Sequence, residues 1–229
     1  MKIGNKEFDL KNHAYVMGIL NVTPDSFSDG GKWNDKGRAM RHTQEMIEQG
    51  ATVSIDTYKS RVAEAALDAG ADLVNDIWGL KYDSDLAGVI ARKNVPCCLM
   101  HNRKEPDYTD FIADFLKDMQ ETIDIAKKAG IADENIILDP GVGFGKTYEN
   151  NLEIINKLEC MHALGYPILL GTSRKSVIGL TLDLPADQRM EGTVATTVIG
   201  VMKGVAFVRV HDVKENYRAL KMTEAILGR

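Results

Sequence analysis

The stretch NIILDPGVGFGKT, residues 135–147, contains the repeating unit from which this chain is built. An apolar run ends on Asp139 and continues into a glycine-rich turn. The next segment, residues 149–165, places apolar residues at helical spacing. The run predicts a buried strand and the spacing predicts an amphipathic helix. The unit is therefore a strand, a loop and a helix.

Six further apolar runs predict strands of the same kind. They are YVMGILNV (15–22), TVSIDT (52–57), LVNDI (73–77), PCCLMH (96–101), PILLGTS (167–173) and VAFVRVHD (205–212). Helical spacing recurs between them, as in residues 37–50, 58–70 and 109–130, and several of these segments end in Gly, which is favoured after a helix C-terminus. Continuous apolar strands that alternate with amphipathic helices predict a parallel sheet covered by helices. A closed barrel and a doubly wound open sheet both fit this pattern.

The ends of the strands favour the barrel. Six strands finish on a polar or ionisable residue and the seventh runs into Ser173; the six residues are Asn21, Asp56, Asn75, His101, Asp139 and His211. In a (β/α) barrel these ends converge on one mouth, where such barrels build their sites. A doubly wound sheet usually has a glycine fingerprint after its first strand, whereas TPDSFSDGG (23–31) follows here. We therefore predict an α/β protein with a (β/α)8 TIM barrel in one domain, residues 1–229, preceded by a hairpin at about 1–12.

The strand count is one short of a complete barrel. The predicted helix over 37–50 passes almost directly into the strand over 52–57. Short helix-to-strand loops are common, so this junction is not abnormal by itself.

Composition and charge point to a small-molecule substrate. The chain has 28 basic and 33 acidic residues and no basic run, which argues against nucleic acid or an anionic membrane as a partner. It has neither a signal-peptide pattern nor a long apolar segment, so we expect a soluble, cytoplasmic protein. Cys97, Cys98 and Cys160 lack zinc-ligand spacing and are expected to be reduced and mostly buried.

Several strand-end residues have both a structural and a functional interpretation. A buried Asp139 needs a partner, either the N–H groups of a ligand or a salt bridge to Lys175 or Arg209. Asp56 and Asn75 could each be a helix N-cap, which their residue types favour, or could bind a heterocycle.

Three other segments have comparable alternatives. Ser173 either caps a helix or belongs to an anion site formed at its start. Arg209 and His211 occupy alternate positions of one strand, which suggests two cations on one face of an anion site. The loop carrying Asn21, Asp25 and Phe27 is either a functional loop at the barrel mouth or a polar surface loop without a function.

Four segments together make the chain resemble the dihydropteroate synthase family of pterin-binding TIM barrels. They are NVTPDSF (21–27), LDPGVGFGK (138–146), TSRKS (172–176) and RVHD (209–212). The resemblance implies transfer of the dihydropterin-methyl group from 6-hydroxymethyl-7,8-dihydropterin diphosphate to p-aminobenzoate, with release of diphosphate, in folate biosynthesis. Compared with the family, roughly one βα unit, on the order of 40 residues, is absent between Ala51 and Thr52.

The resemblance also implies a role for each candidate residue. Asn21 binds Mg²⁺, the implied cofactor, and diphosphate oxygens, while Asp25 and Phe27 lie on a mobile loop over the reacting centre. Arg209 and His211 hold the diphosphate, and Ser173 contributes to the p-aminobenzoate site. The residues implied to bind or enclose the pterin are Asp56, Asn75, Met100, Asp139, Phe144 and Lys175. The implied catalytic set is Asn21, Asp25, Lys175, Arg209 and His211, in a protein that is commonly a homodimer.

Two rival functions remain open at this point. One is a pterin-dependent methyltransferase with a corrinoid partner, in which Asn21, Arg209 and His211 would have no diphosphate to bind. The other is a non-catalytic or loop-deleted pterin-binding barrel, which the missing unit itself suggests.

Overall fold

The computed structural model describes residues 1–19 and 52–229. The predicted helix over 37–50, the junction of Ala51 with Thr52, and the candidates Asn21, Asp25 and Phe27 lie outside the described residues.

All seven predicted strands have a counterpart in the structure. They are β3 (Tyr15–Gly18), β4 (Ser54–Asp56), β5 (Leu73–Asp76), β6 (Cys97–Met100), β7 (Ile136–Asp139), β8 (Leu169–Leu170) and β9 (Phe207–Val210). The predicted N-terminal hairpin is also present, as the antiparallel pair β1 (Lys2–Ile3) and β2 (Lys6–Glu7).

In the described part of the chain, the seven strands form a parallel arc. One sheet has the order β4-β5-β6-β7 and the other β3-β9-β8, and a parallel bridge between Leu138 and Ile168 connects them. Within residues 1–19 and 52–229, β3 and β4 do not pair with each other, so they are the two edges of the arc. This interruption lies where the sequence analysis expects a missing strand.

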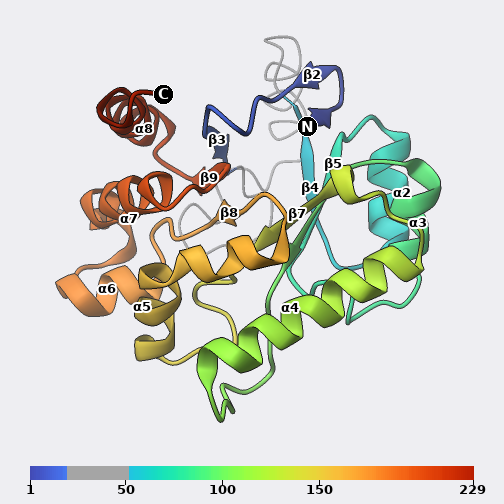
Figure 1. The fold of residues 1–229 in the computed structure, drawn as a ribbon, viewed down its shortest axis with the longest axis horizontal. Coiled ribbons are helices and arrows are strands. Elements are labelled where there is room, and N and C mark those ends of the chain that lie inside the picture. Colours follow the sequence, from blue (N-terminus) through green and yellow to red (C-terminus); the bar gives the residue numbers. More distant parts are fainter. Residues whose placement is uncertain (20–51) are drawn as a thin grey trace.

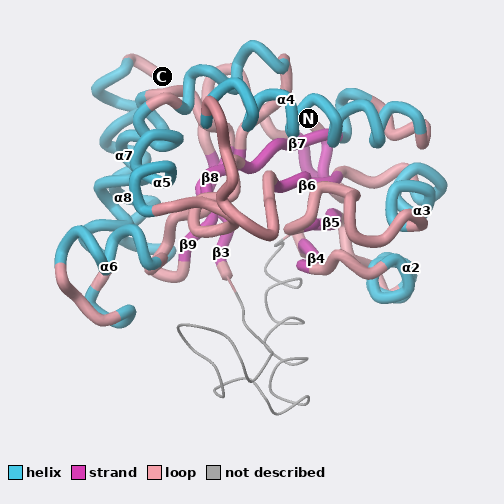
Figure 2. The backbone as a smooth tube through the Cα atoms, turned by 90° about the horizontal axis from the view of Figure 1, so that it is seen from below, coloured by secondary structure: helices cyan, strands magenta, loops and turns pink. Residues whose placement is uncertain are grey.

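Helices surround the arc on its outer side (Figure 2). The α-helices are α2 (Ser60–Asp68), α3 (Leu86–Lys93), α4 (Phe111–Lys128), α5 (Tyr148–Asn156), α6 (Ser176–Leu182), α7 (Met190–Met202) and α8 (Val213–Leu227). Short 3-10 turns η1 (Asp133–Asn135), η2 (Leu158–Leu164) and η3 (Ala186–Gln188) accompany them. No helix in the described part of the chain is long and apolar enough to cross a membrane.

Local sequence signals explain where two of these helices begin. The Asp110 carboxylate accepts a hydrogen bond from the Ala113 N–H and starts α4. Thr147 and Asn150 form a capping box that starts α5 directly after the glycine-rich turn. Each cap satisfies backbone donors that have no partner inside the helix, typically worth about 1 kcal/mol.

The strands alternate between two apolar cores because successive side chains point to opposite faces. Outward residues such as Val74, Leu99, Leu138 and Val208 pack against the helices. Inward strand residues fill the arc, and they are Leu73, Cys98, Ile137, Leu169 and Phe207; Ile3 of the hairpin and Ala206, just before β9, pack with them. Cys97 lies in the outer core and Cys98 in the inner one, both fully buried as expected. This inner core supports the next layer of side chains, at the carboxyl ends of the strands.

Candidate active site

Five of the predicted site residues lie one layer above the inner core. Asn75, Met100, Asp139 and Arg209 each follow an inner-core residue by two positions on the same strand, so they share its inward face. Asp56 lies opposite Asn75 in the parallel register, and Met100 lies opposite Asp139. The barrel therefore brings these residues together at one mouth.

Gly171, at the end of β8, keeps the centre of this mouth free of a side chain. A Cβ atom at this position would lie 3.6 Å from Asp139 Oδ2 and 3.9 Å from Lys175 Nζ. Gly171 was not among the predicted site residues. Its place directly after a strand that leads to the mouth was the available signal.

Asp139 is buried and accepts a hydrogen bond from the backbone N–H of Gly141 at 2.7 Å. Neither predicted salt bridge is present, because Lys175 donates to the Val142 carbonyl and Arg209 pairs with Asp56. Burial raises the pKa of the Asp139 carboxyl, while the charge of Lys175 and the Gly141 hydrogen bond act in the opposite direction. Its second oxygen is therefore available to hydrogen-bond donors of a ligand.

Asn75 and Asp56 do not cap helices. The residues at the N-cap positions of α2 and α3 are Lys59 and Asp85, so this alternative is wrong for both. Asn75 Oδ1 is buried and has no hydrogen-bond partner in the described part of the chain. An unsatisfied buried acceptor costs about 1–3 kcal/mol, which a ligand donor would offset.

Arg209 forms an ion pair with Asp56, with Nη2 and Oδ2 2.9 Å apart. Both side chains are partly exposed, at 27% and 43%, and pairs of this kind contribute about 0–1 kcal/mol. Breaking this ion pair therefore costs little free energy, so Arg209 is available to bind an anion that enters the mouth.

Lys175 reaches into the mouth from the turn before α6. Its ammonium lies 4.7 Å from the centre of the Phe144 ring and donates to the Val142 carbonyl. Burial lowers the pKa of Lys175 to about 8, opposed by the charge of Asp139. The structure thus places Lys175, Phe144 and Asp139 around the same space, as the sequence analysis expected.

The helix-cap interpretation of Ser173 is wrong. Helix α6 begins at Ser176, and Lys175 is at its N-cap position. A positive φ of 57° at Arg174 separates Ser173 from the helix. The Ser173 hydroxyl instead lies 2.9 Å from His211 Nδ1 and accepts from the His211 backbone N–H at 3.1 Å. Sequence reasoning missed this pair, although adjacent parallel strands β8 and β9 bring their ends together.

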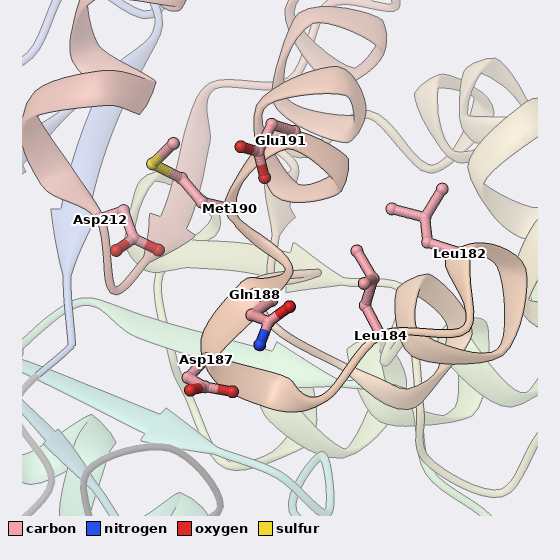
Figure 3. A pocket seen from close by; sticks show the side chains of 7 residues that line it. All are labelled: Leu182, Leu184, Asp187, Gln188, Met190, Glu191 and Asp212. Atoms are coloured by element: carbon pink, nitrogen blue, oxygen red, sulfur yellow. The ribbon is translucent and has the colours of Figure 1, made fainter.

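A neighbouring ion pair was also missed. Arg174 binds Asp212 with two contacts, Nε to Oδ2 at 3.1 Å and Nη2 to Oδ1 at 2.5 Å. Asp212 also lines a cavity of about 590 Å³ between α6, η3 and α7 (Figure 3). The other lining residues are Leu182, Leu184, Asp187, Gln188, Met190 and Glu191. Among the predicted site residues that the structure describes, none lines this cavity.

Among residues 1–19 and 52–229, no group of three or more His, Cys, Asp or Glu side chains could hold a metal ion. The predicted metal ligand, Asn21, lies outside this part of the chain.

The chain matches the sequence model of the pterin binding enzyme family in two segments, residues 17–53 and 51–211. The two segments meet at the junction where the sequence analysis expects an absent unit.

A dihydropteroate synthase of Clostridium beijerinckii is 55% identical, and the alignment covers the full length of both chains. It extends over 269 positions, 40 more than the 229 residues of this chain. That excess agrees with the expected size of one missing βα unit.

Solved structures give the same assignment. A dihydropteroate synthase from Clostridium difficile, solved in the presence of pteroic acid, superposes with a TM-score of 0.89 and 42% identity, covering 97% of this chain and 100% of the other. The Yersinia pestis synthase in complex with a sulfonamide drug superposes with a TM-score of 0.91 and 35% identity, covering 100% of this chain and 98% of the other. The chain therefore belongs to the pterin-binding enzymes, within the dihydropteroate synthases, the transferases of folate biosynthesis that have a TIM-barrel fold.

Proposed function

We propose that the mouth of this barrel binds the dihydropterin ring of 6-hydroxymethyl-7,8-dihydropterin diphosphate and presents its methylene carbon to the amine of p-aminobenzoate. The observation that carries the proposal is the buried Asn75 Oδ1, which has no hydrogen-bond partner among residues 1–19 and 52–229 and lies in the same layer as the Asp139 carboxylate. A pterin ring offers amino and ring N–H donors along one edge. These donors suit the amide oxygen of Asn75, which has no partner in the described part of the chain, and the carboxylate oxygen of Asp139 that Gly141 does not bind.

The walls of the mouth suit a flat ring. Met100 is 3% exposed and lies opposite Asp139, and the Phe144 ring lies beneath the Lys175 ammonium. A polarisable thioether and an aromatic ring both pack well against a heterocycle. Gly171 adds the free space.

The cations at the mouth suit the diphosphate. In the reaction the bond from the methylene carbon to diphosphate oxygen breaks, and diphosphate takes both electrons. The amine nitrogen then forms the new C–N bond and loses one proton to solvent or to the departing diphosphate. Arg209 can exchange its weak pair with Asp56 for the diphosphate, and His211 follows it at the end of β9. The part of Arg209 and His211 is to stabilise the charge that develops on the leaving group, while Ser173, beside His211, belongs to the p-aminobenzoate site.

Mg²⁺ is proposed as the cofactor on chemical grounds. It prefers oxygen ligands and commonly bridges a substrate's phosphate groups to one or two protein side chains. The described residues supply no cluster that could hold it alone, so its ligands would be the diphosphate oxygens and Asn21. When bound, it would neutralise charge on the leaving group.

The loop-deleted rival retains a specific observation in its favour. Within the described residues, the strand order is interrupted between β3 and β4. The pterin residues lie on the continuous run from β4 to β7 and in the segments that follow β7 and β8. Pterin binding therefore depends less on the missing unit than transfer to p-aminobenzoate does. The methyltransferase rival loses its support, because the relatives are synthases.

We also propose a homodimer in the cytoplasm. Nine of the twelve exposed large apolar side chains of the described residues lie on α6, α7 and α8, which pack together on one side of the molecule (Figure 1). Apolar side chains gathered on one face are typical of subunit contacts. Sedimentation at micromolar concentration tests the dimer, and a monomer would overturn it.

Two measurements test the proposed function. Calorimetry with pteroic acid tests the pterin site, and release of diphosphate from the pterin diphosphate in the presence of p-aminobenzoate tests transfer. Binding with turnover supports the complete reaction, whereas binding without turnover identifies the non-catalytic barrel. Absence of pteroic acid binding would overturn the assignment of the mouth.

A further inference from the structure

The turn between β7 and α5 packs directly on the backbone that follows β6. Gly141 and Gly145 have positive φ angles of 67° and 52°. A Cβ atom at Gly141 would lie 1.9 Å from the carbonyl oxygen of His101, and one at Gly145 would lie 2.4 Å from that of Arg103. Only glycine fits such a close approach, so the turn has a defined position on its neighbour.

Lys146, the last residue of this turn, forms hydrogen bonds that hold the turn in place. Its ammonium contacts His101 Nδ1 at 2.8 Å and donates to the carbonyl oxygens of Gly141 and Phe144, each at 3.0 Å. An ammonium has three donors, and these contacts use all three. Lys146 therefore links both ends of the turn to the residue at the end of β6.

His101 is itself held in one orientation. Its Nε2 lies 3.0 Å from Asp118 Oδ2, and Arg103 binds the same carboxylate through Nε at 2.6 Å and Nη2 at 3.1 Å. Because Nδ1 accepts from Lys146, the ring proton is on Nε2 and is donated to Asp118. Burial lowers the pKa of His101 to about 4, which keeps the ring neutral and Nδ1 an acceptor.

The opposite side of the turn faces Lys175. The Val142 carbonyl accepts from Lys175 Nζ, and the Phe144 ring lies under the same ammonium. A Cβ atom at Gly143 would lie 3.2 Å from Lys175 Cδ. The turn is thus enclosed by two lysines, of which Lys175 faces the mouth and Lys146 faces the network behind it.

We propose that Lys146 is a positioning residue for the pterin site, which holds the 141–145 turn in the shape that presents the Val142 carbonyl and the Phe144 ring to Lys175. This inference rests on the proposed function, because it assigns Lys146 an effect on pterin affinity through Lys175. The charged and titratable groups that act on Lys146 are Asp139, Lys175, Asp118, Arg103 and, by direct contact, His101. Burial lowers the pKa of Lys146 to about 7, opposed by the charge of Asp139.

A double-mutant cycle tests the proposal. Pteroic acid affinity is measured by calorimetry for the wild-type chain, Lys146→Met, Lys175→Met and the double variant. We expect Lys146→Met to weaken binding by about tenfold or more in the wild-type background, since a hydrogen-bonded charge is lost. In the Lys175→Met background we expect the same substitution to weaken binding by less than about twofold, because the group that Lys146 positions is already absent. Lys127→Met, which removes an exposed lysine of α4 paired with Asp133, is the matched control and should bind as wild type.

If Lys146→Met weakens pteroic acid binding by the same factor in both backgrounds, or does not weaken it at all, the inference is overturned. If Lys146→Met does not fold, as judged by near-UV circular dichroism, Lys146→Gln enters the same cycle, because its amide retains a donor for one of the three acceptors. Absence of pteroic acid binding by the wild-type chain would instead overturn the proposed function, and this inference with it.

Discussion

Replacing Asp139 with Asn changes hydrogen bonding at the base of the mouth without changing its shape. The Asn carbonyl can still accept from the Gly141 N–H, as Asp139 Oδ1 does at 2.7 Å. The other carboxylate oxygen, which faces the space beside Gly171, becomes an NH₂ group. A pterin N–H would then meet another N–H.

The expected loss of pterin affinity follows from these two changes. A hydrogen bond to a charged group contributes about 1.5–3 kcal/mol, and leaving a buried donor unsatisfied adds a penalty of about 1–3 kcal/mol. Taking a combined loss of about 3 kcal/mol, the dissociation constant for pteroic acid rises by about 150-fold.

Calorimetry with pteroic acid measures this loss, and Asp76→Asn is the matched control. Asp76 also ends a strand and is 1% exposed, but it lies on the outward face and accepts from the backbone N–H groups of Trp78 and Leu80. We expect Asp76→Asn to lower thermal stability and leave pteroic acid affinity unchanged. Unchanged affinity in a folded Asp139→Asn protein would refute the assignment of Asp139 to the pterin.

Three further predictions concern pH, the ion pair and the missing unit. The folded-state pKa of His101 is about 4, below the ordinary value of 6.5, so the unfolded chain binds more protons between these values and stability falls as pH drops through this window. The free energy of unfolding, measured with urea, should be about 3 kcal/mol lower at pH 4 than at pH 7. This difference should be smaller in His101→Gln, but not in His162→Gln at the surface. An equal difference in both variants would contradict the prediction. Asp56→Asn should lower stability by less than about 1 kcal/mol, because its pair with Arg209 is partly exposed, while weakening pteroic acid binding; a larger loss of stability would show that the pair is structural. Insertion of a βα unit of about 40 residues from the Clostridium beijerinckii synthase between Ala51 and Thr52 should raise diphosphate release by about 100-fold or more. Equal turnover with and without the insert would show that the unit is dispensable.

The sequence by itself determined the strands and the mouth at which they end. Apolar runs and helical spacing are local patterns, and burial on both faces makes a parallel strand recognisable without its neighbours. All seven runs are strands, and Asp56, Asn75, Met100, Asp139 and Arg209 share one inward layer. Their roles toward a ligand came from the family resemblance and remain predictions.

Tertiary structure decided which side chains meet. Arg209 pairs with Asp56 across 153 residues, Lys146 contacts His101 across 45, and Ser173 contacts His211 across 38. These partners depend on strand order and register, which a local pattern does not encode. The start of α6 at Ser176 was missed for a related reason, since the left-handed conformation of Arg174 accompanies its long-range pair with Asp212. That β3 and β4 do not pair with each other within the described residues is likewise a property of the assembled sheet, because hydrogen bonding between strands exists only once the neighbours are in place.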